Sequence, residues 1–231
     1  MVTVRAALIG DGRMGREVRA LAPDHGVDVI DVLGTGEMGA APYDRLRAVD
    51  VAVEFTEPGS AVDNIRLCVA AGCPVVVGTS GWYDRLPEVR SIVEQGDGTV
   101  LWSENFSPGY VIMRGLTQRL AAFARVFDGY DVHLVETHHA AKRDAPSGTA
   151  HRLRDQAEAG LGRPIGVTSI RVGHVPGAHE LLVDGPFDQV VLRHDVRDRR
   201  VFADGALRAA RWLVGRRGLY SIEDLAREWG E

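Results

Sequence analysis

Residues 136–150 hold a dense group of side chains that can exchange protons or bind an anion. Two adjacent histidines, His138 and His139, are followed by Lys142 and then by the turn Pro146-Ser147-Gly148-Thr149. Imidazole gives or takes a proton near neutral pH, and an ammonium group can neutralise an acid or donate a proton. This combination fits the binding and protonation of a small anionic substrate.

The sequence around this loop predicts a strand before it and a helix after it. Residues 131–137 alternate as in a strand, and residues 150–159 have the pattern of a helix. Ser147 precedes that helix, so the first N–H groups, those of Gly148 and Thr149, are predicted to form an anion site. A loop between two regular elements is a place where a rigid scaffold can hold reactive groups.

Two other interpretations of the loop need no anionic substrate. The histidines can be a surface pair, with Ser147 acting only as a helix cap. Histidines also bind zinc, but no cysteine and no further ligand lies at metal spacing near them in the sequence. We therefore expect no metal.

Residues 2–15 carry a glycine pattern typical of dinucleotide binding. A strand at residues 2–9 and a helix from residue 16 flank the turn Gly10-Asp11-Gly12-Arg13-Met14-Gly15. In this context Gly10 permits a tight turn, Gly12 lets the backbone approach a diphosphate, and Gly15 lets the helix pack close to the strand. We expect this turn to bind the cofactor; the alternative is that its glycines serve packing alone.

The sequence does not decide between NADH and NADPH. An acidic residue about 20 positions after the first glycine binds the ribose 2′-hydroxyl of NAD, and Asp31 has a suitable position. Asp31 lies inside the second predicted strand, however, and the end of that strand, residues 33–36, has neither acid nor base. Arg13 is a candidate partner for a 2′-phosphate, so both cofactors stay open.

Strands and helices alternate through the first half of the chain, which predicts an α/β fold with a Rossmann-type, doubly wound parallel sheet. The second half instead combines a long helix with several short strands at antiparallel spacing, which predicts a smaller α+β domain with a mixed or antiparallel sheet. We expect the first domain at residues 1–107, the second at 108–203, and a C-terminal helix at 204–231 that returns to the first.

The overall composition excludes several classes of partner. The 231 residues are 45% hydrophobic and 26% charged, as in an ordinary soluble protein with room for two domains. The net charge of −5 argues against a nucleic-acid partner, and no apolar run approaches the length of a membrane span. Without a signal-peptide pattern, we expect a cytoplasmic protein in which Cys68 and Cys73 are free thiols.

The loop at residues 136–150 resembles the signature of the dihydrodipicolinate reductase family, also called 4-hydroxy-tetrahydrodipicolinate reductases. Gly78-Thr79-Ser80-Gly81 is similar to the family's Gly-Thr-Thr-Gly turn, and residues 103–109 are similar to its Asn-Phe-Ser-x-Gly element. Residues 171–180 and the C-terminal helix also match, so the resemblance spans essentially the whole chain. Glu54 and Ser80 depart from the family's usual aspartate and threonine.

The resemblance implies an NAD(P)H-dependent reduction of a cyclic dicarboxylate imine in diaminopimelate and lysine biosynthesis. It implies that His138 is the proton donor or acceptor and Lys142 the second donor. Carboxylate contacts are expected at His139, Lys142, Ser147, Gly148 and Thr149. Besides residues 10–15, cofactor contacts are expected at Gly78, Thr79, Ser80, Ser103, Glu104, Asn105 and Phe106. The family further implies a homotetramer built through the sheet of the second domain, and we interpret His194 and Arg199 as structural or interface residues.

Two other functions stay open on sequence grounds. Glu54, Ser80 and the missing ribose acid are compatible with a related reductase that acts on a different cyclic imine in another pathway. A non-catalytic, nucleotide-sensing regulator on the same scaffold is expected to lack the histidine or the lysine, and both are present. Phe106 can also be a core residue without a cofactor role.

Overall fold

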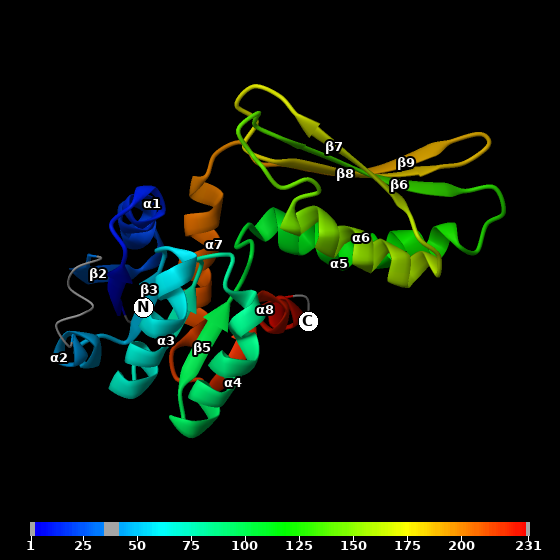
Figure 1. The fold of residues 1–231 in the computed structure, drawn as a ribbon. Coiled ribbons are helices and arrows are strands. Elements are labelled where there is room, and N and C mark those ends of the chain that lie inside the picture. Colours follow the sequence, from blue (N-terminus) through cyan, green and yellow to red (C-terminus); the bar gives the residue numbers. More distant parts are fainter. Residues whose placement is uncertain (1–2, 35–41, 230–231) are drawn as a thin grey trace. The chain divides into compact units, whose positions relative to one another are not determined.

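The computed structural model describes residues 3–34 and 42–229, and it divides the chain into two compact units. The first unit comprises the chain up to Ser107 and again from Arg200 onwards, and the second comprises Pro108–Arg199. The returning helix begins at Arg200 rather than near residue 204, because Arg200–Phe202 continue its first turn. Figure 1 shows both units, with helices and strands labelled where there is room.

The first unit is a six-stranded parallel sheet in the order β10-β5-β4-β3-β1-β2. Its strands are β1 (Val4–Ile9), β2 (Val27–Leu33), β3 (Val51–Glu54), β4 (Val75–Val77), β5 (Thr99–Trp102) and β10 (Gly218–Ser221). Its helices are α1 (Arg13–Leu21), α2 (Tyr43–Arg47), α3 (Pro58–Ala71), α4 (Leu86–Gln95), α7 (Arg200–Leu213) and α8 (Ile222–Trp229), with short 3₁₀ turns at η1 (Ala22–His25) and η3 (Tyr83–Arg85). The predicted doubly wound parallel sheet is confirmed.

Two details of this sheet differ from the sequence-based expectation. Strand β10 pairs in parallel with β5, although its four residues begin with a glycine and carry too short an apolar pattern to indicate a strand. Helix α2 has only five residues, too few for their pattern to indicate a helix. Residues 35–41, which include the last two positions of the expected ribose-binding turn, lie outside the described residues.

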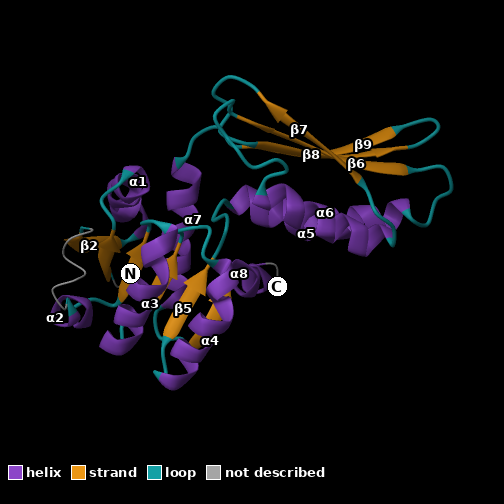
Figure 2. Cartoon of the chain, viewed as in Figure 1, coloured by secondary structure: helices purple, strands orange, loops and turns teal. Residues whose placement is uncertain are grey.

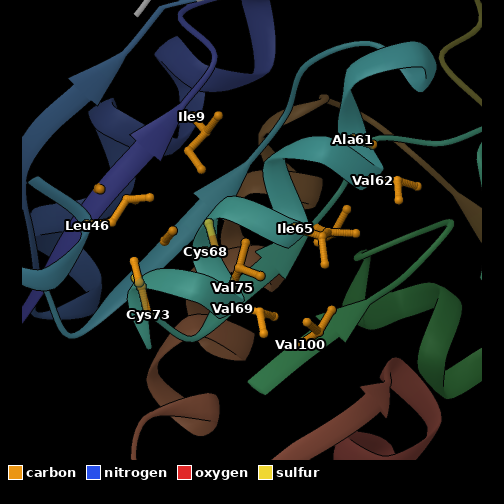
Figure 3. Packing of buried hydrophobic residues seen from close by; sticks show 14 of the residues in the cluster. Ile9, Leu46, Ala61, Val62, Ile65, Cys68, Val69, Cys73, Val75 and Val100 are labelled. Atoms are coloured by element: carbon orange, nitrogen blue, oxygen red, sulfur yellow. The ribbon is translucent and has the colours of Figure 1, made fainter. Parts of the chain in front are cut away.

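The central strands are buried on both faces, because helices cover each side of the sheet. Helices α3 and α4 pack on one face, and α7 contacts β3, β4 and β5 from the other. Figure 3 shows Ile65 of α3 among side chains of the sheet such as Val75 and Val100. Cys68 and Cys73 lie in this core as free, buried thiols, as expected.

The second unit is a four-stranded sheet in the order β7-β6-β8-β9, with two helices on one face (Figure 2). Its elements are α5 (Pro108–Ala124), β6 (Asp131–His138), α6 (Gly148–Leu161), β7 (Gly166–Arg171), β8 (Ala178–Asp184) and β9 (Gln189–Asp195). Strand β6 pairs antiparallel with β8 but parallel with β7. Of the two expected forms, mixed or antiparallel, the sheet is therefore the mixed one. Helix α6 makes the crossover that the parallel neighbours β6 and β7 need.

On the helix-covered face of the second sheet, the residues of β6 change from apolar to polar along the strand. Val132 and Leu134 pack with Leu153 of α6 and with Leu181 of β8 in an apolar core. Toward the end of β6, the residues of the same face are polar, and they remain buried. The end of β6 thus places two ionisable side chains, Glu136 and His138, in the protein interior. Within the described residues, no helix is long and apolar enough to cross a membrane.

Candidate active site

Glu136 and His138 stand two positions apart on β6, so their side chains lie on the same buried face. The carboxylate of Glu136 has no exposed surface, and both of its oxygens are engaged. Oε2 meets Nδ1 of His138 in a short hydrogen bond, and Oε1 accepts from Nη2 of Arg171 at 2.6 Å. The register of β6 and β7, in which His138 lies opposite Arg171, produces this chain of three side chains.

The charges of this chain follow from its burial and its partners. Burial alone would raise the pKa of Glu136, but Arg171, Ser169 and His138 together lower that pKa to about 2. Burial lowers the pKa of His138 below its ordinary value, although the Glu136 carboxylate opposes this shift. At neutral pH, Glu136 is therefore ionised and can only accept, so Nδ1 of a neutral His138 carries the proton that it donates.

The other ring nitrogen of His138 lies beside Gly177. A Cβ atom on Gly177 would come within 3.1 Å of Nε2, and the glycine has a φ of +157°. The missing side chain keeps space next to Nε2, which is the ring nitrogen not bonded to Glu136. This atom is the one with which His138 can exchange a proton.

His179 of β8 joins the same cluster from the other side of β6, because it lies opposite Glu136 in the antiparallel ladder. Its ring meets that of His138 edge to face at a centroid distance of 5.3 Å. Its Nε2 lies 3.4 Å from Oγ of Ser147. Burial, followed by the nearby His138, lowers the pKa of His179 to about 3, so this ring is neutral.

Glu136, His138 and His179 are also a set of metal-ligand type, with ligand atoms within 4.8 Å of one another. The sequence around the histidine pair does not indicate His179 as a further ligand, because it comes from a distant strand. A cation between them would have to replace the proton shared by Glu136 and His138, and it would face the guanidinium that already neutralises Glu136. The contacts therefore favour a hydrogen-bonded cluster.

Lys142 is half-buried in the loop after β6, where its Nζ lies 2.8 Å from Oδ1 of Asp144. Its backbone N–H donates to the carbonyl of the half-buried His139, which forms a turn. Arg171 also donates to the carbonyl of Asp144 at 2.6 Å. One arginine therefore ties this loop to Glu136 and fixes the ammonium group near the end of β6.

The loop ends at the first turn of α6, as predicted. Ser147 is buried and caps the helix, since its Oγ accepts from the N–H of Ala150 at 3.2 Å. Gly148 is exposed, Thr149 is half-buried, and the first turn contains no acidic residue. Ser147 thus caps α6, and its contact with His179 joins the helix start to the histidine cluster.

The glycines of the turn after β1 differ in their surroundings: two are crowded by the protein, and one is open to a ligand. A Cβ on Gly10, whose φ is +98°, would lie 2.2 Å from the carbonyl oxygen of Phe55, and one on Gly15 would lie 2.2 Å from that of Gly10. Packing alone explains these two glycines. Gly12 is exposed, and a Cβ there would meet no atom within 4 Å. It precedes α1 without a side-chain cap, so the structure leaves a cradle at a helix N-terminus, as a diphosphate requires.

The remaining expected cofactor residues lie at the carboxyl ends of the central strands, where parallel sheets bind ligands. Within the glycine turn, Asp11 and Arg13 are exposed and Met14 is half-buried. After β4, Thr79 accepts from the N–H of Thr56 through Oγ1 at 2.7 Å, while Ser80 is exposed and Gly78 is half-buried. After β5, Glu104 is half-buried, and the other three residues, Ser103, Asn105 and Phe106, are buried.

Gly78 and Phe106 are held by close packing around Phe55. A Cβ on Gly78 would lie 2.0 Å from the Phe55 ring, and Phe106 meets the same ring edge to face at 6.5 Å. A Cβ on Gly205 of α7 would overlap the carbonyl of Phe106 at 1.6 Å. The core interpretation of Phe106 thus accounts for its side chain, while the backbone of its loop stays at the ligand-binding edge.

Asp31, the candidate ribose acid, is already paired. The guanidinium of Arg45 in α2 donates to it through Nε at 2.7 Å and through Nη2, and the same guanidinium reaches the carbonyl of Val32. This hydrogen-bonded ion pair lowers the pKa of Asp31. Asp31 therefore links β2 to α2, and it is not an unpaired acid that could select NADH through the ribose 2′-hydroxyl.

Glu54, at the end of β3, has no exposed surface, and its Oε1 accepts from Oγ1 of Thr56 and from Nδ2 of Asn64. Burial raises the pKa of Glu54, and these hydrogen bonds reduce the shift only partly. A raised pKa means that folding favours the protonated form. The contribution of Glu54 to stability is therefore full below its unfolded pKa of about 4.5 and is lost as the pH rises through the higher folded value.

We accordingly expect Glu54→Gln, which imitates the protonated acid, to raise the melting temperature at neutral pH. The gain should shrink as the pH falls toward the unfolded pKa, because wild-type Glu54 is then protonated as well. Thermal unfolding followed between about pH 4 and pH 8 tests this prediction. Glu57→Gln, at an exposed carboxylate nearby, is the control; a variant that is less stable than wild type at high pH would contradict the raised pKa.

Comparison with known proteins identifies relatives along the whole chain. The family models "Dihydrodipicolinate reductase, N-terminus" and "Dihydrodipicolinate reductase, C-terminus" match residues 4–106 and 109–226. A 4-hydroxy-tetrahydrodipicolinate reductase from Methanoculleus marisnigri is 35% identical over 97% of this chain and 98% of its own length. One from Christiangramia forsetii is 30% identical over 95% and 96%.

Solved structures show where the fold recurs. A dipicolinate-bound dihydrodipicolinate reductase from Paenisporosarcina superposes with a TM-score of 0.77 at 20% identity, covering 96% of this chain and 98% of its own. A putative myo-inositol dehydrogenase from Sinorhizobium meliloti has a TM-score of 0.59 at 14% identity, covering 89% and 86%. At these identities, both comparisons concern the fold alone.

Proposed function

This chain belongs to the dihydrodipicolinate reductase family, and we propose that it reduces 4-hydroxy-tetrahydrodipicolinate to tetrahydrodipicolinate with NADH or NADPH, in diaminopimelate and lysine biosynthesis. The observation that carries this proposal is the buried cluster at the end of β6. It joins a carboxylate-bonded imidazole, a nearby ammonium and a helix N-terminus in one loop. The dipicolinate in a structurally similar reductase is a ring with two carboxylates, which supports a substrate of that kind.

The first unit supplies the cofactor site in this proposal. When bound, NADH or NADPH supplies the hydride. The backbone at Gly12 and the start of α1 bind the diphosphate, since no side chain blocks that approach. The loops after β4 and β5, with residues 78–80 and 103–106, line the nicotinamide half. No residue of the described part of the turn after β2 selects between the two cofactors, so we propose activity with both.

The second unit supplies the protons. Loss of the 4-hydroxyl group as water converts the substrate into a conjugated imine. Hydride addition to a ring carbon of this imine leaves negative charge on the ring, and a proton must arrive at the neighbouring carbon. Lys142 is the cationic donor, held by Asp144 until the substrate arrives. The His138 imidazole, neutral in the unliganded protein, gains a proton more easily when a dianionic ring approaches, because negative charge favours its cationic form. His138 then gives that proton through Nε2.

The same loop binds the two carboxylates. Ser147, Gly148 and Thr149 form the start of α6, where backbone N–H groups and a positive helix terminus stabilise anions. We assign a further carboxylate contact to His139, in the loop before this helix. Lys142 adds a full positive charge. These local groups attract the dianion despite the net charge of −5 for the whole chain.

We further propose that the protein acts in the cytoplasm as a homotetramer assembled through the second sheet. The face of this sheet opposite α5 and α6 carries exposed apolar residues on both outer strands, among them Ile170 of β7 and Val191 of β9, each more than 40% exposed. Apolar side chains on an uncovered sheet favour burial against another copy.

A steady-state assay with the lysine-pathway intermediate tests the activity. We expect oxidation of both NADH and NADPH, with a kcat/KM at least about 10²-fold higher for the diacid than for a cyclic imine with one carboxylate, because a lost carboxylate leaves hydrogen-bond donors of the site unpaired. A preference for the monocarboxylate would support the alternative of a different imine reductase. Cofactor binding without turnover of either imine would support the non-catalytic regulator.

A further inference from the structure

We propose that Glu136 is a positioning residue for His138, which it holds in the tautomer with the proton on Nδ1, and that Arg171 fixes Glu136 for this task. The inference deepens the proposed function, because its effect on turnover depends on that function. The tautomer itself is a property of the unliganded protein. It can therefore be tested even if the substrate proves to be a different one.

The geometry assigns each oxygen of the Glu136 carboxylate a separate task. Arg171 Nη2 can only donate, so it requires an acceptor at Oε1. Oε2 of the same carboxylate then faces His138 Nδ1. An ionised carboxylate only accepts, so the imidazole must donate from Nδ1, and Nε2 is left for the substrate side, next to Gly177.

The elements that surround His138 give Glu136 a second effect. Lys142 from the loop and Arg171 from β7 are cationic, while His179 from β8 is neutral and separates His138 from His194 of β9. Among these neighbours Glu136 is the carboxylate that contacts His138, whereas Asp144 contacts Lys142. Without the Glu136 carboxylate, a protonated His138 would face two cations and lose its counter-charge.

A merely structural role is the competing explanation, because the carboxylate also neutralises a buried arginine. The variant Glu136→Gln separates the two. The Gln carbonyl oxygen must turn toward Arg171, which accepts no hydrogen bond, so the amide NH₂ faces His138. Nδ1 then has to accept, and the proton moves to Nε2. The side chain keeps its size while the tautomer is reversed.

The direct measurement is an NMR spectrum that correlates the ring nitrogens with the ring protons of ¹⁵N-histidine-labelled, unliganded protein, with His138 assigned from His138→Gln. We expect the Nδ1–H tautomer in the wild type and the Nε2–H tautomer in Glu136→Gln. The matched control is Glu180→Gln on β8, which removes a carboxylate paired with Arg193 in the same sheet. It should leave the His138 signals unchanged. An Nε2–H tautomer in the wild type, or the same tautomer in both proteins, would overturn the inference.

The kinetic measurement asks whether the tautomer matters for turnover. In Glu136→Gln we expect kcat to fall roughly 10²-fold or more, as for a general acid or base held in the wrong tautomer. The limb of the pH profile that reports His138 should move to lower pH, while NADPH affinity stays unchanged. Glu136→Asp should restore the Nδ1–H tautomer and part of kcat. A reversed tautomer with wild-type kcat and pH profile would refute the positioning role, whereas an inactive wild type with the expected tautomers would refute the substrate assignment alone.

Discussion

Lys142→Ala is expected to lower kcat for reduction of the diacid imine by roughly 10²–10⁴-fold, the usual contribution of a positioned acid. The ammonium of Lys142 lies in the loop after β6, its charge acts on His138, and Asp144 orients it. Its removal takes away both a proton and a counter-charge for the substrate. KM for the imine should rise as well, because an ammonium–carboxylate contact also binds the ground state.

The comparison that makes this result specific uses Arg143→Ala. Arg143 is the next residue, it is exposed, and it carries the same charge. If the loop merely attracts the dianion through its net charge, the two variants should lose a similar amount of kcat/KM. If Lys142 gives a proton, only its removal should lower kcat.

Cofactor binding provides the second control for Lys142. The dissociation constant of NADPH, measured by fluorescence titration without substrate, should change less than about twofold in Lys142→Ala and in His138→Gln. The residues proposed to bind the cofactor belong to the other compact unit of the chain. Loss of NADPH binding in either variant would contradict the roles proposed for the loop.

The sequence identifies side chains that follow one another along the chain, and it does less well with those that meet across strands. His138, Lys142 and Ser147 lie within one short loop, so their types and spacing are enough to indicate their chemistry. Arg171 and His179 join them only through the register of β6 with β7 and β8, which depends on long-range pairing. Their sequence signal is the family resemblance of residues 171–180, which contain both.

The same limit applies to the fold. The strand–glycine turn–helix pattern around Gly10 specifies the first βα unit locally, and the alternation that follows specifies a parallel sheet. Strand β10 is stabilised by its neighbour β5 rather than by its own short pattern. Asp31 shows the same limit. Its position relative to Gly10 made it one candidate for a ribose contact, and only the structure shows that Arg45 of α2 pairs with it.

Gly12→Ala is expected to lose NADPH affinity, whereas Gly10→Ala is expected to lose stability, although both change one glycine of the same turn. Gly12 has an ordinary φ of −63°, and a Cβ there meets no protein atom, so the variant should keep wild-type stability. The new methyl group occupies the space that we assign to the diphosphate. We expect the dissociation constant of NADPH to rise about tenfold or more, which corresponds to about 1.4 kcal/mol of binding free energy.

Gly10→Ala should instead destabilise the first unit even in the absence of a ligand. Its φ of +98° strains an alanine, and its Cβ would overlap the Phe55 carbonyl oxygen, which belongs to the backbone rather than to a flexible side chain. Strain and overpacking together are expected to cost about 2–5 kcal/mol of unfolding free energy. Denaturant unfolding and NADPH titration of both variants separate the two effects. Wild-type NADPH affinity in Gly12→Ala would contradict the proposed diphosphate site. The glycines of the turn would then serve packing alone, since crowding already explains Gly10 and Gly15 without a ligand.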